Sequence, residues 1–152
     1  MIKRLLMFSI LLTGTRVAQE AKVTPLLSKD LTGIPDTQIG KVTSLMTKDL
    51  PDVSGKEGLL ITVDFAPGEV VAPHRHDADV FAYVLEGSII TQLKDGRPQT
   101  IHTGEAFYES PTDVHIASRN ASKTQPAKLL VFFVKAKGVP PTVVLGKGNT
   151  SH

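Results

Sequence analysis

The sequence predicts an all-β domain, an antiparallel sandwich or barrel with an N-terminal strand arm. From Glu57 onward, short apolar runs recur at intervals of about ten residues and are separated by turn residues. Asp95-Gly96 lies between two of these runs and is a typical hairpin turn. After the first nineteen residues no segment has sustained helical periodicity. Together these observations favour antiparallel strands joined by short turns.

The expected strands follow one another closely along the chain. The first run ends at Ala66-Pro67-Gly68, which interrupts any element. The chain from Gly138 is expected to be a loose arm or an edge strand. The strand-like runs are EGLLITVDF (57–65), DVFAYVLEG (79–87), SIITQLKDG (88–96), PQTIHTG (98–104), EAFYES (105–110), VHIASRN (114–120) and KLLVFFVKA (128–136).

An internal near-repeat precedes these strands. KVTPLLSKDL at 22–31 recurs as KVTSLMTKDL at 41–50, with seven of ten positions identical. Two copies do not make a solenoid, which needs at least three repeats. We interpret the repeat as a tandem duplication of an N-terminal strand. The alternative is that the extra copy pairs with a sheet edge, in its own chain or in a partner.

The first nineteen residues resemble a signal peptide. A short basic start, Lys3-Arg4, precedes the apolar run LLMFSILLTG, which is too short to span a membrane comfortably. Cleavage is expected after Val17-Ala18-Gln19, and Thr15 stands where a lipoprotein would need cysteine. The expected organisation is a signal peptide at 1–19, an arm at 20–54, a barrel at 55–136 and a tail at 137–152. The mature protein is then periplasmic or extracellular, the alternatives being an uncleaved anchor or a wrongly chosen start codon.

Composition excludes several classes of function. The chain has 152 residues, enough for one domain, and its lack of cysteine excludes disulfides and thiolate chemistry. Residues 1–19 hold three basic residues and no acid, so their removal changes the net charge from +2 to −1. No basic patch then favours nucleic acid as a partner. No stable membrane span is expected once the leader is removed.

Three histidines are the candidate metal ligands. His74 and His76 lie two residues apart in GEVVAPHRHDADVFAYVLEG, so on an extended segment both imidazoles point the same way, roughly 7 Å apart. His115 follows in GEAFYESPTDVHIASRN, on a later strand that a barrel could bring across the cavity. Three neutral imidazoles with open positions suit a divalent metal such as Fe, Mn, Ni, Cu or Zn. The alternative is a polar cluster at the barrel mouth without metal.

These two stretches resemble the two motifs of the cupin family of small β-barrel proteins. In the first motif, Gly68, His74, His76 and Gly87 fall in the family's places. The resemblance covers roughly residues 55 to 136. It implies a double-stranded β-helix, or jelly-roll, fold and a divalent metal held by His74, His76 and His115.

The second motif departs slightly from the family pattern. Gly104, Pro111, His115 and Asn120 resemble it, with one extra residue before the proline and one fewer after it. Asp113 stands where that motif has its turn glycine.

The main departure is in the first motif, where Val80 occupies the position of the family's glutamate ligand. Asp77 and Asp79 are nearby, but strict alternation from His76 sends both to the opposite face; only a bulge would turn Asp79 inward. The fourth ligand is therefore water or substrate. Some cupin dioxygenases work with three histidines alone.

Other polar side chains are expected to be structural. The Asn120 side chain should hold a loop by hydrogen bonds, as the resemblance implies, and Arg75 should face away from the histidines. His102 is expected on a surface or edge strand. Packing or turn roles are expected for Tyr83, Tyr108, Glu86 and Glu105.

Three functions remain open. The first is an exported small cupin that binds a divalent metal and a small organic ligand, with dioxygenase chemistry as the enzymatic version. Val80, Ala82 and Val84 suggest a lining that favours a ligand with an apolar part. The second is a non-enzymatic module for binding or sensing, and the third is a metal-dependent isomerase or epimerase. The resemblance also implies a homodimer.

Overall fold

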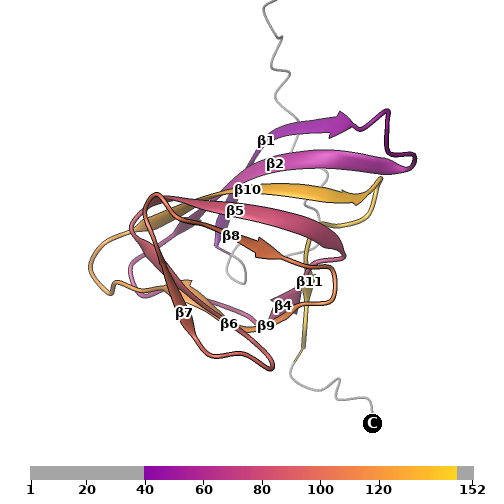
Figure 1. The fold of residues 1–152 in the computed structure, drawn as a ribbon. Helices are drawn as coiled ribbons and strands as arrows, with labels where there is room; N and C mark the ends of the chain where they lie inside the picture. The colour runs from indigo at the N-terminus through magenta and orange to yellow at the C-terminus, as the bar shows by residue number, and fades with distance from the viewer. Residues whose placement is uncertain (1–39, 147–152) are drawn as a thin grey trace, which may run out of the picture.

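The computed structural model describes residues 40–146, and these form only strands, turns and loops (Figure 1). Every run from residue 57 to 136 that was expected to be a strand is one, which confirms the all-β prediction. The described residues include no helix long and apolar enough to cross a membrane. The proposed leader and the first copy of the repeat, 22–31, lie outside the described residues.

Two antiparallel sheets make up the domain, in the double-stranded β-helix arrangement. The first sheet has the order β1-β2-β10-β5-β8 and the second the order β11-β4-β9-β6-β7, with β3 also paired to β9. The first sheet contains β1 (Lys41–Asp49), β2 (Lys56–Phe65), β10 (Ala127–Ala136), β5 (Ala78–Glu86) and β8 (Ala106–Glu109). The second contains β11 (Val143–Val144), β4 (His74–Arg75), β9 (Val114–Asn120), β6 (Ser88–Leu93) and β7 (Gln99–His102), with β3 at Val70–Val71.

Alternation along the strands places the core between the two sheets. On β5, every second side chain from Ala78 to Val84 is buried, while Phe81, Tyr83 and Leu85 face outward. Strands β2 and β10 contribute the same way, and Val71 and Ile89 close the core from the second sheet. The interior is therefore mostly apolar; its polar exceptions include the histidines and a buried ion pair between Lys135 and Glu57.

The glycine and asparagine of the two motifs meet at one corner of the barrel. Gly87 has φ of 71°, and a Cβ atom there would lie 2.6 Å from the carbonyl oxygen of Pro126, so only glycine fits. The Asn120 amide donates to the carbonyl oxygens of Ala66 (3.1 Å) and Gln125 (2.8 Å). Its own oxygen accepts from the Ser122 N–H at 2.9 Å. The loop-holding role predicted for Asn120 is confirmed.

Both ends of the described chain add strands to the barrel. The second copy of the repeat forms β1, which pairs with β2 at the edge of the first sheet. Residues of the tail form β11, which pairs with β4 at the edge of the second sheet. The tail is thus an edge strand over this stretch, and it brings Pro141 and Thr142 close to the histidines.

Candidate metal centre

The barrel brings the three predicted histidines together. His74 on β4 lies directly opposite His115 on β9, and His76 follows two residues later. The ring centroids are 5.0 Å apart for His74 and His76, 5.1 Å for His74 and His115, and 6.0 Å for His76 and His115. All three side chains are buried, with exposed fractions of 8%, 7% and 2%. The spacing in sequence therefore becomes one cluster in space.

Each imidazole is held on its Nδ1 side by an oxygen atom. His74 Nδ1–H donates to the carbonyl oxygen of Ala72 and His76 Nδ1–H to that of Pro141, both at 2.8 Å. The Thr142 hydroxyl lies 3.2 Å from the same His76 nitrogen, and Thr91 Oγ1 lies 3.0 Å from His115 Nδ1. A carbonyl oxygen only accepts, so a neutral His74 or His76 presents a lone pair at Nε2. Such anchoring orients a histidine for metal ligation.

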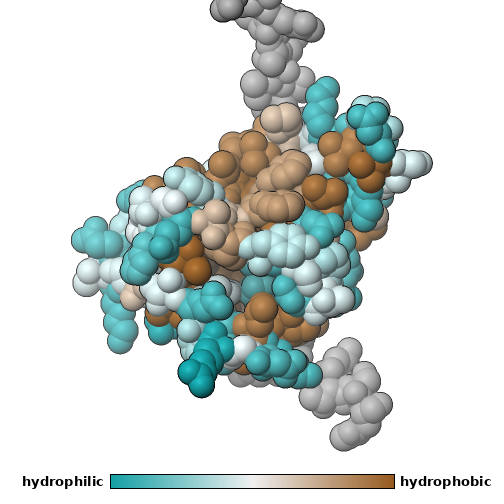
Figure 2. Space-filling model, in the orientation of Figure 1, coloured by the Kyte–Doolittle hydropathy of each residue, from teal (hydrophilic) through white to brown (hydrophobic). Residues whose placement is uncertain are grey.

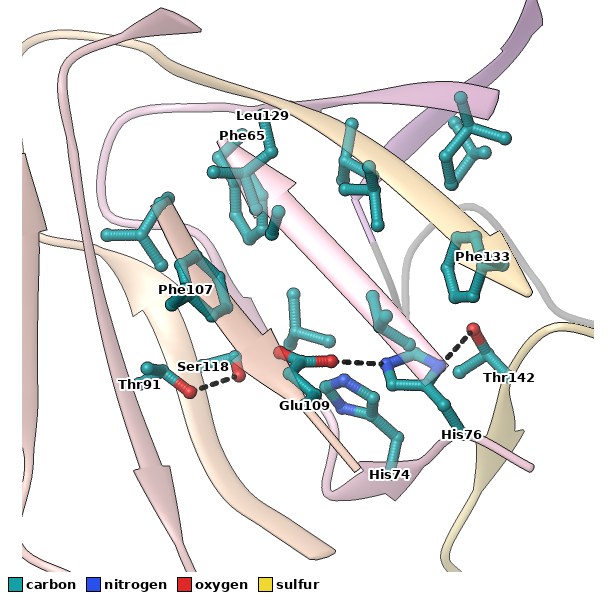
Figure 3. A pocket seen from close by; sticks show the side chains of 18 residues that line it. Phe65, His74, His76, Thr91, Phe107, Glu109, Ser118, Leu129, Phe133 and Thr142 are labelled. Atoms are coloured by element: carbon teal, nitrogen blue, oxygen red, sulfur yellow. Dashed lines mark hydrogen bonds and ion pairs between the residues drawn. The ribbon is translucent and has the colours of Figure 1, made fainter. Parts of the chain in front are cut away.

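Glu109 is a member of this cluster that the sequence analysis missed. It ends β8, where it is buried at 8% exposure and pairs with Val80 across the β5–β8 register. Its Oε2 lies 3.3 Å from His76 Nε2, a contact drawn in Figure 3. Its Oε1 lies 3.3 Å from His115 Nε2. The sequence could have predicted this position. In the strand EAFYES, Glu109 is two residues after Phe107, so both side chains point to the same face, and Phe107 marks that face as the buried one.

Burial and the contacts among these side chains shift the pKa values of His74, His76 and Glu109. Burial lowers the pKa of His74 from 6.5 to about 4, with a further contribution from the neighbouring His76. Burial also lowers the pKa of His76, against the opposing effect of Glu109. For Glu109, burial alone would raise the pKa, but the contact with His115 and the charges of the other imidazoles outweigh it and the pKa is lowered. Neutral His74 and His76 beside an ionised Glu109 are the protonation states that metal binding requires of these side chains.

The donor set fits a divalent metal ion. Within residues 40–146, His115 Nε2 is a buried polar atom with no hydrogen-bond partner, and it lies 3.3 Å from the carboxylate that also contacts His76 Nε2. Imidazole nitrogen with carboxylate oxygen suits Zn, Mn, Fe, Ni or Cu. No group of three or more such side chains in the described part of the chain is already set at coordinating geometry. Binding would therefore require these side chains to adjust around the ion.

His74, His76 and Glu109 line a cavity of about 80 Å³, whereas His115 is not part of its lining. Figure 3 shows this cavity. Most of the wall is apolar, and the polar groups gather near the histidines. Thr91, Ser118 and Thr142 add hydroxyl groups at that end. Val80 and Ala82 line the cavity as expected, whereas Val84 is buried in the core beside it. The remaining lining residues are Val42, Ile61, Val63, Phe65, Val71, Ile89, Phe107, Leu129, Val131 and Phe133.

The two nearby aspartates lie outside the cluster, as alternation predicted. Asp77 is exposed and forms an ion pair with Arg75, which faces away from the histidines. Asp79 is on the outer face of β5 and accepts a hydrogen bond from the Tyr108 hydroxyl at 2.6 Å. No bulge turns Asp79 inward, because β5 pairs with β10 without a register shift from Ala78 to Val84.

The other polar residues also lie away from the cluster. His102 is exposed on the edge strand β7, where its Nδ1 lies 3.0 Å from Ser88 Oγ. Glu105 accepts the backbone N–H of His102 at 2.7 Å and so closes a turn. Tyr83 and Glu86 are exposed on β5.

Comparison with known proteins identifies the same family that the sequence motifs and the fold resemble. A family model described as a cupin domain matches residues 61–133. A cupin domain from Bordetella pertussis is similar at 18% identity with a TM-score of 0.51, covering 68% of this chain and 100% of that chain. Among curated proteins, no sequence matches this chain.

Two solved structures with assigned names are also similar. Oxalate oxidase in complex with glycolate is 26% identical with a TM-score of 0.56, covering 82% of this chain and 66% of that chain. The chain therefore spans just under two thirds of that protein's length. The polyketide cyclase RemF from Streptomyces resistomycificus is 26% identical with a TM-score of 0.53, covering 70% of this chain and 72% of that chain.

Proposed function

Because this chain belongs to the cupin family, we propose that it binds a divalent metal ion through His74, His76 and His115 and a small organic ligand beside it. The observation that carries the proposal is the arrangement of the imidazole nitrogens. Nδ1 of each ring lies against an oxygen atom, and Nε2 of His76 and of His115 faces the buried Glu109 carboxylate. When bound, the ion would polarise an oxygen atom of the ligand.

The cavity limits the size of the ligand. About 80 Å³ compares with roughly 30 Å³ for one water molecule in the liquid, so a rigid cavity accepts only a few non-hydrogen atoms. The ligand's polar group would face the histidines, where the hydroxyls of Thr91 and Ser118 can donate hydrogen bonds. Its apolar part would contact Val80 and Ala82.

We propose dioxygenase chemistry as the leading activity. Two similar structures, oxalate oxidase and a polyketide cyclase, carry different reactions on this fold, so the fold alone does not select one. The second candidate is a binding or sensing module, favoured by the small size of the cavity. A metal-dependent isomerase is the third.

The test is oxygen uptake by metal-loaded protein with a panel of small organic acids and phenols that includes glycolate and oxalate. Uptake that requires metal and ligand, and that is lost in His115→Ala, is expected for a dioxygenase. Ligand binding by calorimetry without uptake would support the binding module instead. Conversion of the ligand without uptake would support the isomerase.

A homodimer is the second part of the proposal. Paired apolar residues form one row across all five strands of the first sheet. Met46, Phe132, Phe81 and Tyr108 are exposed, and Leu60 between Met46 and Phe132 is half-buried. The Phe81 and Tyr108 rings are 5.3 Å apart, and Figure 2 shows apolar side chains gathered over this part of the molecule. A contiguous exposed apolar surface is typical of a protein interface.

Light scattering after size-exclusion chromatography tests the dimer. Wild type should have twice the mass of one chain, and Phe81→Lys should have the mass of one. Ile116→Lys, at an exposed site on the other sheet, is the control that should remain dimeric. A monomeric wild type would contradict the proposal.

Export is the third part. The basic start and apolar run of residues 1–19 support it. In a host that processes the leader, intact-mass measurement of the exported protein should show a chain that starts at Glu20. Accumulation of the full-length chain inside the cell would contradict this.

A further inference from the structure

Position 80 and position 109 face each other across one strand pair. Val80 on β5 and Glu109 on β8 are directly opposite in the antiparallel register, and both side chains are buried in the interior. Cβ atoms of such opposite residues lie about 5 Å apart on the same face of a sheet. A carboxylate carried by β8 therefore enters nearly the same space as one carried by β5.

The atoms around the Glu109 carboxylate are mostly hydrogen-bond acceptors. His76 uses its Nδ1 proton on a carbonyl oxygen, so in the neutral ring its Nε2 offers a lone pair 3.3 Å from Glu109 Oε2. His74 is held the same way through its own Nδ1. His115 Nε2, also 3.3 Å from the carboxylate, makes no hydrogen bond to any described residue. Buried acceptors that face one another are costly unless a cation lies between them.

We infer that Glu109 is the carboxylate ligand of the metal centre, supplied by β8 in place of the side chain at position 80. The inference rests on the proposed three-histidine site and adds a fourth protein ligand to it. Ligand-to-ligand distances support the role. Two donors at bonds of about 2.1 Å to one ion lie roughly 3.0 to 3.4 Å apart, and both carboxylate-to-imidazole distances are 3.3 Å. The carboxylate would also offset one positive charge of a buried divalent ion.

A titration with Co²⁺ tests the inference, because the visible absorption of Co²⁺ depends on its ligands. The protein is stripped with chelator and titrated as wild type and as Glu109→Gln, with Kd measured by competition. We expect Glu109→Gln to weaken Co²⁺ binding about 100-fold and to change the visible spectrum. Loss of a residue that only hydrogen-bonds to a ligand already costs up to about 100-fold, and Glu109 is inferred to be a ligand itself. The control is Glu86→Gln, an exposed carboxylate on the neighbouring strand, which should match wild type. A Glu109→Gln protein with wild-type affinity and spectrum would overturn the inference.

Moving the carboxylate to position 80 on β5 gives an independent test of the inference. The double variant Val80→Glu/Glu109→Val keeps the same two residue types in the pair, and it should restore Co²⁺ affinity to within about tenfold of wild type. If Glu109→Gln does not fold, as judged by its thermal transition, the double variant decides. Restored binding supports the inference, and a folded double variant that binds no better than Val80→Leu/Glu109→Val overturns it. Failure of wild type itself to bind Co²⁺ would instead overturn the proposed metal site, and this inference with it.

Discussion

The two ends of the barrel interior are buried to a similar degree but differ in chemistry. At one end Val63, Phe65 and Leu129 pack with apolar neighbours. At the other end Glu109 contacts His76, as Figure 3 shows, and also His115, with His74 beside them. Burial at the apolar end is favourable because it removes hydrocarbon from water. At the polar end the same burial disfavours charge, and the histidines are anchored on one side only. The apolar end therefore provides stability, and the polar end is available for binding.

The largest expected effect is on stability at the apolar end. Leu129→Ala should lower the free energy of unfolding by about 3 kcal/mol, because it removes a buried side chain and leaves a cavity. Leu85→Ala makes the same chemical change at a site that is 42% exposed and should cost less than about 1 kcal/mol. Urea unfolding measures both. Equal losses would show that the apolar end is not the stabilising part of the interior.

The next effect is a pH dependence that belongs to the polar end. His74 has a pKa of about 4 in the folded protein and an ordinary value of 6.5. Between these values the unfolded chain binds more protons, so stability rises with pH across this window and falls as pH drops from 6.5 toward 4. Metal-free protein should lose about 2 kcal/mol between pH 7 and pH 5 through this residue.

Urea unfolding at several pH values checks this dependence. His74→Gln should flatten the curve, while His102→Gln, at an exposed histidine, should leave it unchanged. A curve that is equally steep in wild type and His74→Gln would contradict the assignment.

The smallest expected effect on stability is that of Glu109→Gln. A neutral amide can donate to the lone pair of His76 Nε2, which a carboxylate cannot, so the metal-free variant should unfold within about 1 kcal/mol of wild type. Thermal or urea unfolding in chelator measures it. A loss of several kcal/mol would mean that Glu109 forms a stabilising ion pair with a charged imidazole in the metal-free protein. That result would contradict the view that the carboxylate serves mainly to bind a metal ion.

Most of the fold was predictable because it depends on local patterns. Alternation on β5 separates Val80 from Asp79 and Phe81, and turn residues such as Asp95-Gly96 mark the strand ends. The HxH spacing also placed His74 and His76 on one side. These features depend only on residues that are close together in the sequence.

The remaining parts of the cluster depend on which strands pair. Glu109 reaches the histidines only because β8 pairs with β5 in one register, and Pro141 reaches His76 only because β11 pairs with β4. Neither register is encoded in a short stretch of sequence. The missing glutamate at Val80 was visible in the sequence, but its replacement from the opposite strand was not.

Elemental analysis of protein purified without a tag, as wild type and as His76→Ala, tests the metal centre most directly. We predict about one divalent metal ion per chain in wild type and none in His76→Ala, with both proteins folded. Iron or copper would direct the search toward oxygenation, and zinc or nickel toward polarisation of a ligand. Wild type that stays metal-free after incubation with each candidate ion would contradict the account, and the histidines would then be polar residues filling the barrel mouth.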